Sequence, residues 1–353
     1  MTQIAGGKME PIEAKQFVVK AGFELVRSGL IARTWGNVSC RIDEKRFAIT
    51  PSGRDYQTLT PEEIVEVEIQ DLSYSGSIKP SSEKGIHASV YRIRPDINFV
   101  IHTHQENASA LSATDLDYFR PVSPYSELSK TVVCAKYALP GTKTLCKNAT
   151  AAMEISSGNA VILKHHGTLC IGSDYQKAFL TASQLEDASG AFLNANGAGI
   201  QVSSVPAARK ASEVADDLLS AWNSSGRNGV LLLNTDFDVV RFSHQGIVLK
   251  PLLDDFAQIV GTRIKTVEND TNSIIQSLKS VSAVLIKGFG AVCWGSSMSD
   301  AEAVSMILRK NCKAFFAAQA FGLPNYIKPW EALLMRTVYL KKYAKMDANN
   351  KRQ

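Results

Sequence analysis

The stretch "INFVIHTHQENASA", residues 97–110, ends an apolar run with two histidines, His102 and His104, that are one residue apart. In a β-strand, residues i and i+2 project from the same face, so both imidazoles would point the same way. Two such rings can bind one metal ion if a third ligand comes from elsewhere in the fold. The pair can equally be structural histidine at a half-exposed strand end, so other parts of the sequence have to decide between the two interpretations.

The composition indicates an ordinary globular protein. The chain has 353 residues, of which 45% are hydrophobic, and this is enough for about two domains with buried cores. Charged residues make up 21% and the formal net charge is +5, without the runs of Lys and Arg that mark a nucleic-acid-binding face. This mild positive balance suits a small anionic ligand better. The six cysteines are scattered and form no CxxC pair, so we expect buried thiols.

The sequence also predicts where the protein resides. Residues 1–17 contain no apolar core of the kind found in secretory signals. No segment approaches the ~18 consecutive apolar residues that would span a bilayer. We therefore expect a cytoplasmic protein that binds neither a membrane nor nucleic acid.

Helices and strands are mixed without a strict βαβ alternation, which predicts an α/β protein with layers around a mainly antiparallel sheet. Hydrophobic periodicity and turn residues place helices at residues 11–30, 82–94 and 174–195, and strands at residues 37–42, 46–50, 59–69, 97–104 and 157–172. Residues 197–212 are small and polar, and they are expected to form a linker.

An internal repeat lies across that linker. Residues 160–199 match residues 283–322 at a constant offset and without gaps. Seven identities support the match: Ala160, Val161, Lys164, Gly167, Cys170, Gly172 and Ser173 recur as Ala283, Val284, Lys287, Gly290, Cys293, Gly295 and Ser296. The motif "KHHG" of the first copy is "KGFG" in the second. Upstream, Asn234 and Asp236 are expected to fall opposite His102 and His104, so the second copy would repeat the fold and not the imidazoles.

The histidines cluster in the first copy. Five of the six lie between residues 87 and 166, and His166 follows a predicted strand. If that strand end lies beside His102 and His104, three neutral imidazoles can bind a zinc ion and leave a fourth position open, as catalytic zinc sites do. The repeat supports this interpretation, because the pair and the third histidine are lost together. His165 is a weaker candidate that could only orient a neighbour.

Three short turns precede the histidines. They are "TWGNVS" at 34–39, "TPSG" at 50–53 and "PSSE" at 80–83. Such turns aim backbone N–H groups and hydroxyls outward, which is how a loop can bind a phosphate, although each turn alone would be unremarkable. Glu83 closes the third turn. It is either a general acid/base near a metal ion or a helix cap.

Taken together, these motifs resemble those of the class II aldolase/adducin family. The pieces "GNVS", "ITPSG", "PSSE…H…YRIRPD", "HTH", "YALPGT" and "HHG" follow the family's order and spacing over roughly residues 11–200. The resemblance implies a layered α/β/α domain that spans residues 1–200, followed by a degenerate copy without metal ligands at residues 201–353.

The resemblance also implies roles for individual residues. It implies zinc, or another divalent metal, bound by His102, His104 and His166. It implies proton transfer by Glu83, and a Tyr125 that acts across a subunit interface in a homo-oligomer. The residues that would bind a substrate phosphate are Gly36, Asn37, Ser52, Gly53, Ser81 and Ser82.

The implied reaction is retro-aldol cleavage of a phosphorylated ketose to dihydroxyacetone phosphate and an aldehyde. The metal would act as a Lewis acid, Glu83 would move the proton at the enediolate carbon, and Tyr125 would handle the proton on the aldehyde oxygen. No lysine stands out as a Schiff-base candidate. The family's epimerases carry Asp in place of Glu83, which favours an aldolase here.

Other functions remain open from sequence. The family also contains lyases, dehydratases, decarboxylases and epimerases that use the same metal and carboxylate, and non-catalytic adducin-like binding modules that have lost the metal ligands. A dinucleotide fingerprint at "KGFGAVCWG" is not supported, because its glycine spacing is wrong and the repeat accounts for those glycines.

Overall fold

The computed structural model describes residues 9–31, 35–198, 218, 222–223, 228–279 and 281–350. The chain divides into two compact units, Met1–Asn196 and Gly197–Gln353. Most of the expected linker, residues 199–212, lies outside the described residues. Within the described ranges, no helix is long and apolar enough to cross a membrane.

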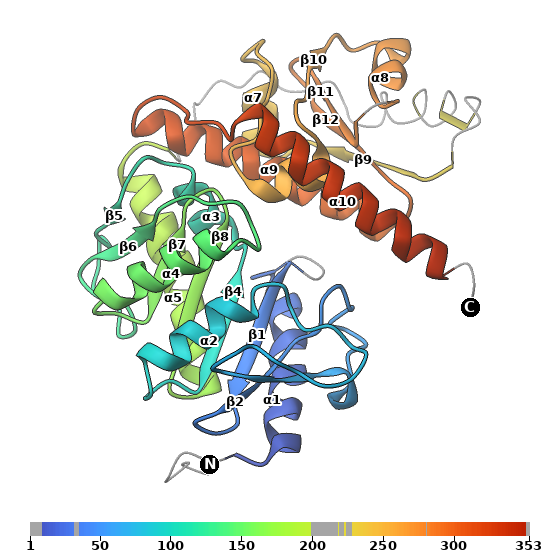
Figure 1. Cartoon of the computed structure of the whole chain (residues 1–353). Coiled ribbons are helices and arrows are strands. Elements are labelled where there is room, and N and C mark those ends of the chain that lie inside the picture. The colour runs from blue at the N-terminus through green and yellow to red at the C-terminus, as the bar shows by residue number, and fades with distance from the viewer. Residues whose placement is uncertain are drawn as a thin grey trace. The chain divides into compact units, whose positions relative to one another are not determined.

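The first unit is built on an eight-stranded sheet (Figure 1). In sheet order the strands are β3 (Val65–Glu68), β2 (Arg46–Ile49), β1 (Gly36–Arg41), β4 (Phe99–Thr103), β8 (Gly167–Gly172), β7 (Ala160–Leu163), β6 (Val132–Ala135) and β5 (Tyr118–Phe119). Only β6 and β7 pair in parallel. The predicted mixed α/β domain with a mainly antiparallel sheet is confirmed.

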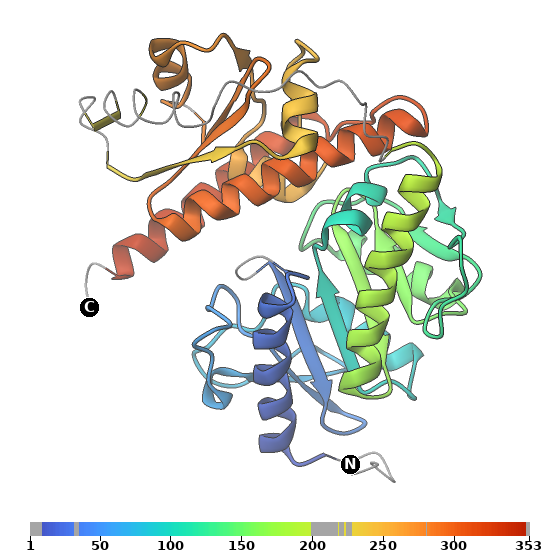
Figure 2. The same ribbon diagram turned by 180° about the vertical axis from the view of Figure 1, so that it is seen from behind.

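Helices cover both faces of this sheet. They are α1 (Pro11–Arg27), α2 (Lys84–Ile93), α3 (Glu106–Ser112), α4 (Lys143–Ile155) and α5 (Tyr175–Ala195), with a short 3₁₀ turn at η1 (Pro61–Glu63). Helices α1, α3 and α5 lie on one face, which Figure 2 shows from behind, and α2 and α4 lie on the other. Three layers result, and the core between the sheet and the α2–α4 layer is formed by residues such as Val90, Tyr91, Leu145, Met153 and Ile171.

Strand β4 is the central strand of the sheet, and all five of its residues are buried. It pairs with β1 on one side and with β8 on the other, both antiparallel. A strand that is covered on both faces and on both edges must be apolar almost throughout, which explains the run "INFVI" before the histidines. The predicted strand at 97–104 and the predicted strand pair at 157–172 are therefore confirmed.

The second unit has a four-stranded sheet in the order β10 (Thr266–Val267), β11 (Ala283–Ile286), β12 (Gly290–Gly295), β9 (Val230–Asn234). Its helices are α7 (Phe237–Ser243), α8 (Thr271–Ser277), α9 (Met298–Ala320) and α10 (Pro329–Asn350), with a π-helical turn at η2 (Phe256–Val260). Helix α9 packs on β12 and β9, and α10 packs on η2. Its core contains Trp222, Ile274, Val284, Phe289 and Val292.

The end of β8 provides a test of this packing. A Cβ atom on Gly172 would lie 2.3 Å from the backbone nitrogen of Ala178, because the first turn of α5 packs directly on the strand. We expect Gly172→Ala to lower the free energy of unfolding by about 1–3 kcal/mol through overpacking, as measured by urea denaturation.

Gly85→Ala is the matched control. Gly85 lies in α2, and a Cβ atom there would lie 3.6 Å from its nearest neighbours, so the substitution should be neutral or stabilising by up to about 1 kcal/mol. Equal effects of the two substitutions would contradict the close approach of α5 to β8.

Candidate metal centre and active site

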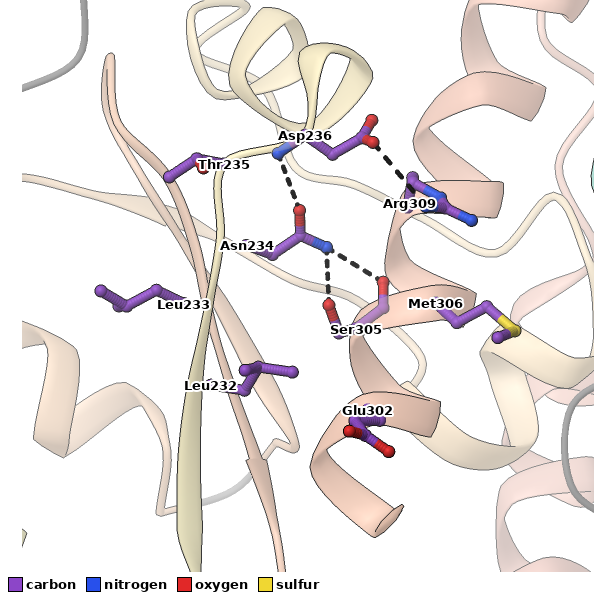
Figure 3. Close-up of a pocket in the computed structure, with 9 residues that line it drawn as sticks. All are labelled: Leu232, Leu233, Asn234, Thr235, Asp236, Glu302, Ser305, Met306 and Arg309. Atoms are coloured by element: carbon purple, nitrogen blue, oxygen red, sulfur yellow. Dashed lines mark hydrogen bonds and ion pairs between the residues drawn. The ribbon is translucent and has the colours of Figure 1, made fainter. Parts of the chain in front are cut away.

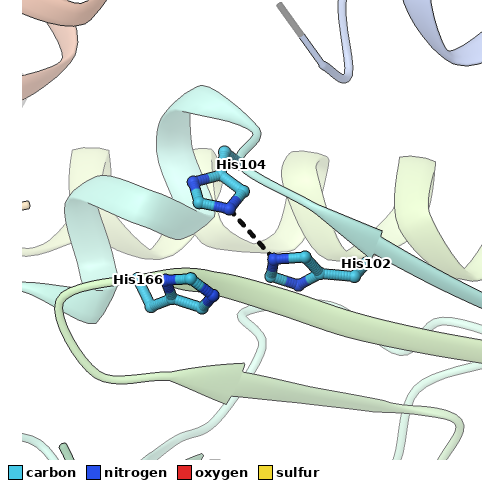
Figure 4. Close-up of side chains that lie close together, drawn as sticks. All are labelled: His102, His104 and His166. Carbon is cyan, nitrogen blue, oxygen red and sulfur yellow. Dashed lines mark hydrogen bonds between the residues drawn. The ribbon is translucent and has the colours of Figure 1, made fainter. Parts of the chain in front are cut away.

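Three imidazoles meet at the end of β4 (Figure 4). His102 lies in β4, and His104 follows two residues later, where the strand ends. His166 lies in the turn between β7 and β8. Because Thr103 pairs with Thr168 in the β4–β8 ladder, this turn is adjacent to the end of β4. One ligand nitrogen from each ring lies within 4.8 Å of the others, and the described residues contain no second group of this kind.

In the turn "KHHG", the side chains of the two histidines lie in different surroundings. His165 has a left-handed backbone with φ of 59°, which is uncommon for a residue other than glycine. Its backbone N–H donates to the carbonyl of Ser112, and its ring packs edge-on against Tyr137 at 5.2 Å between centroids. His166 is therefore the member that faces the other two rings.

His102 is held in a tautomer that leaves its Nε2 atom free to bind a metal. Its Nδ1 lies 2.8 Å from the carbonyl oxygen of Thr168, which can only accept, so Nδ1 carries the hydrogen and Nε2 carries the lone pair. The Nε2 atoms of His102 and His104 are only 2.9 Å apart. Burial lowers the pKa of His102 to about 3 and outweighs the opposing effect of Glu83, so the ring is neutral, as a metal ligand must be.

Glu83 faces the imidazoles. Its Oε1 lies 2.9 Å from Nε2 of His166, and its Oε2 lies 3.3 Å from Nε2 of His102. Asn37 donates from Nδ2 to the same Oε2 at 2.9 Å. Burial raises the pKa of Glu83, but the effects of His102 and His166 and the hydrogen bonds from His166 and Asn37 hold that pKa well below its usual range.

Glu83 is not a helix cap. It occupies the position before α2, but its side chain makes no capping hydrogen bond to that helix. The side chain points to the histidines, so the interpretation of Glu83 as a cap is wrong. Three imidazole nitrogens and one carboxylate oxygen form a donor set that fits zinc or a similar divalent ion. The sequence did not single out Glu83 as a metal ligand, because only the contact across the fold shows it beside the rings.

Two of the three predicted turns lie side by side. The backbone N–H of Ser52 donates to the carbonyl of Lys79, and that of Ser81 donates to the carbonyl of Thr50. The Ser81 hydroxyl accepts from the backbone N–H of Glu83, so these turns are continuous with the metal centre. Ser82 is exposed next to them, and Gly53 has a left-handed backbone with φ of 75°.

The prediction of a turn at 34–39 is wrong for residues 36–39, which begin strand β1, and Asn37 reaches the site from that strand. Its neighbour Gly36 has φ of 138°, and a Cβ there would lie 2.7 Å from the carbonyl oxygen of His102. Gly36 therefore has a structural reason for its identity, which is the close pairing of β1 with β4. The contact of Gly36 with a phosphate stays a prediction.

Tyr125 is half-buried in the loop between β5 and β6. The residues after it are attached to α5: Ser126 accepts from the Gln184 amide through its hydroxyl, and the backbone N–H of Glu127 donates to the Gln184 oxygen. Among the described contacts, none joins Tyr125 to the histidines. The role of Tyr125 in the site stays a prediction.

His87 is a member of the site that the sequence left without a role. It lies in α2, is fully buried, and contacts Asn37 through Nε2 and Ser39 through Nδ1. Burial lowers the pKa of His87 to about 4. Its place four residues after Glu83, one helical turn further along α2, is the signal that could have connected it with the site.

Comparisons with known proteins identify relatives of the first unit. A sequence model of the family described as "Class II Aldolase and Adducin N-terminal domain" matches residues 16–193, which contain every predicted site residue. The 5-deoxy-D-ribulose 1-phosphate aldolase of Bacillus thuringiensis serovar kurstaki is 34% identical over 176 residues, 49% of this chain and 80% of that protein. The L-fuculose phosphate aldolase of Escherichia coli O6:H1 is 31% identical over 183 residues, 50% of this chain and 81% of that protein.

A solved structure of an L-fuculose 1-phosphate aldolase is also similar to this chain. It is 33% identical, with 57% of this chain and 92% of that chain covered and a TM-score of 0.49. The family match and the two aldolases that are 34% and 31% identical support the prediction of an aldolase-type carbon–carbon lyase.

The histidine geometry predicts the metal content. We expect His102→Ala and His166→Ala each to lose most of the bound divalent metal, because two imidazoles bind zinc much more weakly than three. His165→Asn should retain it, since Asn tolerates a left-handed backbone and His165 faces away from the other rings. Elemental analysis after dialysis measures the difference, and equal metal in all three variants would rule out the site.

The buried His87 predicts a pH dependence of stability. Because its folded pKa of about 4 lies below the ordinary histidine value of 6.5, the unfolded chain binds the proton more readily. The contribution of the neutral ring is complete above pH 6.5 and is lost as the pH falls to about 4, by roughly 3 kcal/mol. Urea unfolding of metal-free protein at several pH values should show a shallower decline for His87→Gln. Parallel curves would contradict the assignment.

Proposed function

The chain belongs to the class II aldolase and adducin family, and on this basis we propose that residues 1–200 form a metal-dependent aldolase. Its substrate would be a phosphorylated ketose similar to fuculose 1-phosphate, cleaved to dihydroxyacetone phosphate and an aldehyde. The observation that carries the proposal is the Glu83 carboxylate, which is buried against the imidazoles of His102 and His166. Two relatives are named for 1-phosphate or phosphate esters of ketoses, which supports this substrate class.

The metal would be bound by His102, His104 and His166, with Glu83 able to add an oxygen ligand. When bound, a zinc or similar divalent ion supplies a Lewis acid that polarises the ketose carbonyl. The protein's own contribution is to keep His102 neutral and to orient the rings toward one point. The hydrogen bond from Nδ1 of His102 to Thr168 fixes one ring, and the left-handed His165 turns His166 inward.

Glu83 would carry the proton at the carbon next to the carbonyl. Because its pKa is held well below the usual range, the carboxylate is ionised at neutral pH and can accept a proton. In the condensation direction it removes the proton from that carbon, and in cleavage it returns the proton to the same carbon after the carbon–carbon bond breaks.

The substrate phosphate would lie over the adjoining turns. The backbone N–H groups and hydroxyls that we assign to it belong to Gly36, Asn37, Ser52, Gly53, Ser81 and Ser82. The pairing of the Thr50–Ser52 and Lys79–Ser81 backbones supports this assignment, because it gathers two of the turns next to Glu83.

Tyr125 would act on a neighbouring subunit's site in a homo-oligomer, as the proton donor for the aldehyde oxygen. The loop that carries Tyr125 is attached to α5 through Ser126 and Glu127. The native mass of the protein tests the proposal, and a monomer would contradict it.

We further propose that residues 201–353 are a degenerate copy of the same fold. In β4–β8, Thr103 pairs with Thr168, and in β9–β12, Asn234 pairs with Ala291. When Gly167 is aligned with Gly290, as the repeat requires, Thr168 corresponds to Ala291. Their strand partners, Thr103 and Asn234, then correspond to each other as well. Gly288 has φ of 68°, close to the left-handed value of its repeat partner His165.

This alignment corrects one expectation. Asn234 falls opposite Thr103, so Leu233 and Thr235, and not Asn234 and Asp236, take the positions of His102 and His104. A one-residue shift moves a side chain to the other face of a sheet. Asn234 accordingly points to α9, where its Nδ2 donates to the hydroxyl of Ser305 at 2.9 Å (Figure 3).

The cavity on that face has a different chemistry from the metal centre. It holds about 280 Å³, and its polar lining includes Asp236 and Arg309, which are 3.8 Å apart. No imidazole lines it. We propose a structural role for the second unit.

The central test replaces Glu83. We expect Glu83→Gln to keep the fold and the bound metal, since three imidazoles remain, while turnover falls by ~10²-fold or more. Release of dihydroxyacetone phosphate from a panel of ketose 1-phosphates, with and without a chelator, measures both the activity and its metal dependence. Glu62→Gln, an exposed carboxylate in η1, is the matched control and should be fully active.

Two outcomes would overturn parts of this proposal. Normal turnover by Glu83→Gln would remove the proton-transfer role. Absence of cleavage by the unsubstituted, metal-loaded protein across the whole panel would remove the aldolase activity itself.

A further inference from the structure

A chain of buried hydrogen bonds runs from the core of the first unit to Glu83. The Tyr91 hydroxyl contacts Ser39 Oγ at 2.7 Å, and Ser39 Oγ contacts Nδ1 of His87 at 2.6 Å. Nε2 of His87 contacts Oδ1 of Asn37, and Nδ2 of Asn37 donates to Glu83 at 2.9 Å. None of the five side chains is more than 9% exposed.

The carboxylate at one end fixes the direction of these bonds. Ionised Glu83 can only accept, so Asn37 must present its NH₂ group to Glu83 and its oxygen to His87. His87 must then donate from Nε2, which leaves Nδ1 to accept from the hydroxyl of Ser39. Ser39 in turn accepts from Tyr91. Every bond points toward Glu83, an arrangement in which each bond polarises the next.

We propose that His87 is a positioning residue, which fixes the amide of Asn37 so that its NH₂ group faces Glu83. One N–H is bonded to Glu83 and orients the carboxylate toward the imidazoles. Under the proposed function, the second N–H would donate to the substrate phosphate. This inference rests on the proposed roles of Glu83 and Asn37 and assigns a residue that supports both of them.

An amide cannot hold this orientation by itself. The two ends of an Asn side chain have nearly the same shape, so only hydrogen bonding decides which end faces the carboxylate. If the amide turned over, its oxygen would face the Glu83 carboxylate, and two acceptors would repel each other in a buried site. The donor on His87 excludes that arrangement. Tyr91 and Ser39 matter less, because they act only on the tautomer of His87.

A first experiment needs no substrate and no substitution in the working protein. In zinc-loaded protein with ¹⁵N-labelled histidine, long-range ¹H–¹⁵N correlation spectra identify the protonated nitrogen of each ring. The His87 signals are assigned by their absence from the spectrum of His87→Gln. We expect the Nε2–H tautomer for His87. An Nδ1–H tautomer would mean that the oxygen of Asn37 does not face His87, and it would overturn the inference.

A second experiment measures turnover and metal content in three variants. His87→Leu removes the donor to Asn37 and should lower kcat by about 10-fold or more at unchanged metal content. The reason is that the Asn37 amide is then no longer fixed, so its hydrogen bond to the charged Glu83 is lost. His87→Gln keeps an N–H donor for Asn37 and should recover kcat to within about 3-fold of the unsubstituted protein. Tyr91→Phe, in the same helix and equally buried, should also stay within about 3-fold.

The variants separate a positioning role from a structural one. If His87→Leu and His87→Gln lose the same activity, or if Tyr91→Phe falls as far as His87→Leu, the buried chain serves the fold and the inference is wrong. Should His87→Leu fail to fold, the tautomer measurement decides. Absence of aldolase activity in the unsubstituted protein would refute the proposed function, while the tautomer measurement would still test the orientation of Asn37.

Discussion

The antiparallel pairing of β4 with β8 puts Thr103 opposite Thr168, and the metal centre depends on this register. It places the turn that carries His166 beside the strand end that carries His102 and His104. The same pairing lets the carbonyl of Thr168 accept from Nδ1 of His102, which directs the opposite nitrogen of that ring into the site. A shift of one residue in this ladder would turn the ligands to the other face of the sheet.

The second constraint is electrostatic. An ionised carboxylate is costly to bury unless polar groups compensate it, and Glu83 is only 9% exposed. Asn37 donates to one of its oxygens, and Nε2 of His166 lies 2.9 Å from the other. The fold therefore stabilises a negative charge beside three imidazole rings, which is a favourable place for a divalent cation. The orientation of Asn37, and through it that of His87, follows from the same charge.

Under the proposed duplication, the two units share a fold and only the first keeps the metal ligands. What determines the ladder in each unit is backbone packing. A Cβ on Gly167 would meet the carbonyl oxygen of Thr103 at 2.3 Å, and a Cβ on Gly290 would meet that of Asn234 at 2.2 Å. These close approaches do not require the imidazoles. Under the proposed duplication, the histidine positions could change to Leu233 and Thr235 while the strands continued to pair in the same way.

The sequence by itself determined the features that depend on local periodicity. The two-residue period of a strand put His102 and His104 on one face, and the turn residues of "KHHG" put His166 at a strand end. The same logic failed for β9, because "VLLL" is apolar at every position and carries no period that fixes its register. Only the tertiary structure decided that Glu83 faces the imidazoles and does not cap α2. The reason is that its partners come from β1, β4 and the β7–β8 turn, whose approach depends on sheet pairing between distant segments and not on any local pattern.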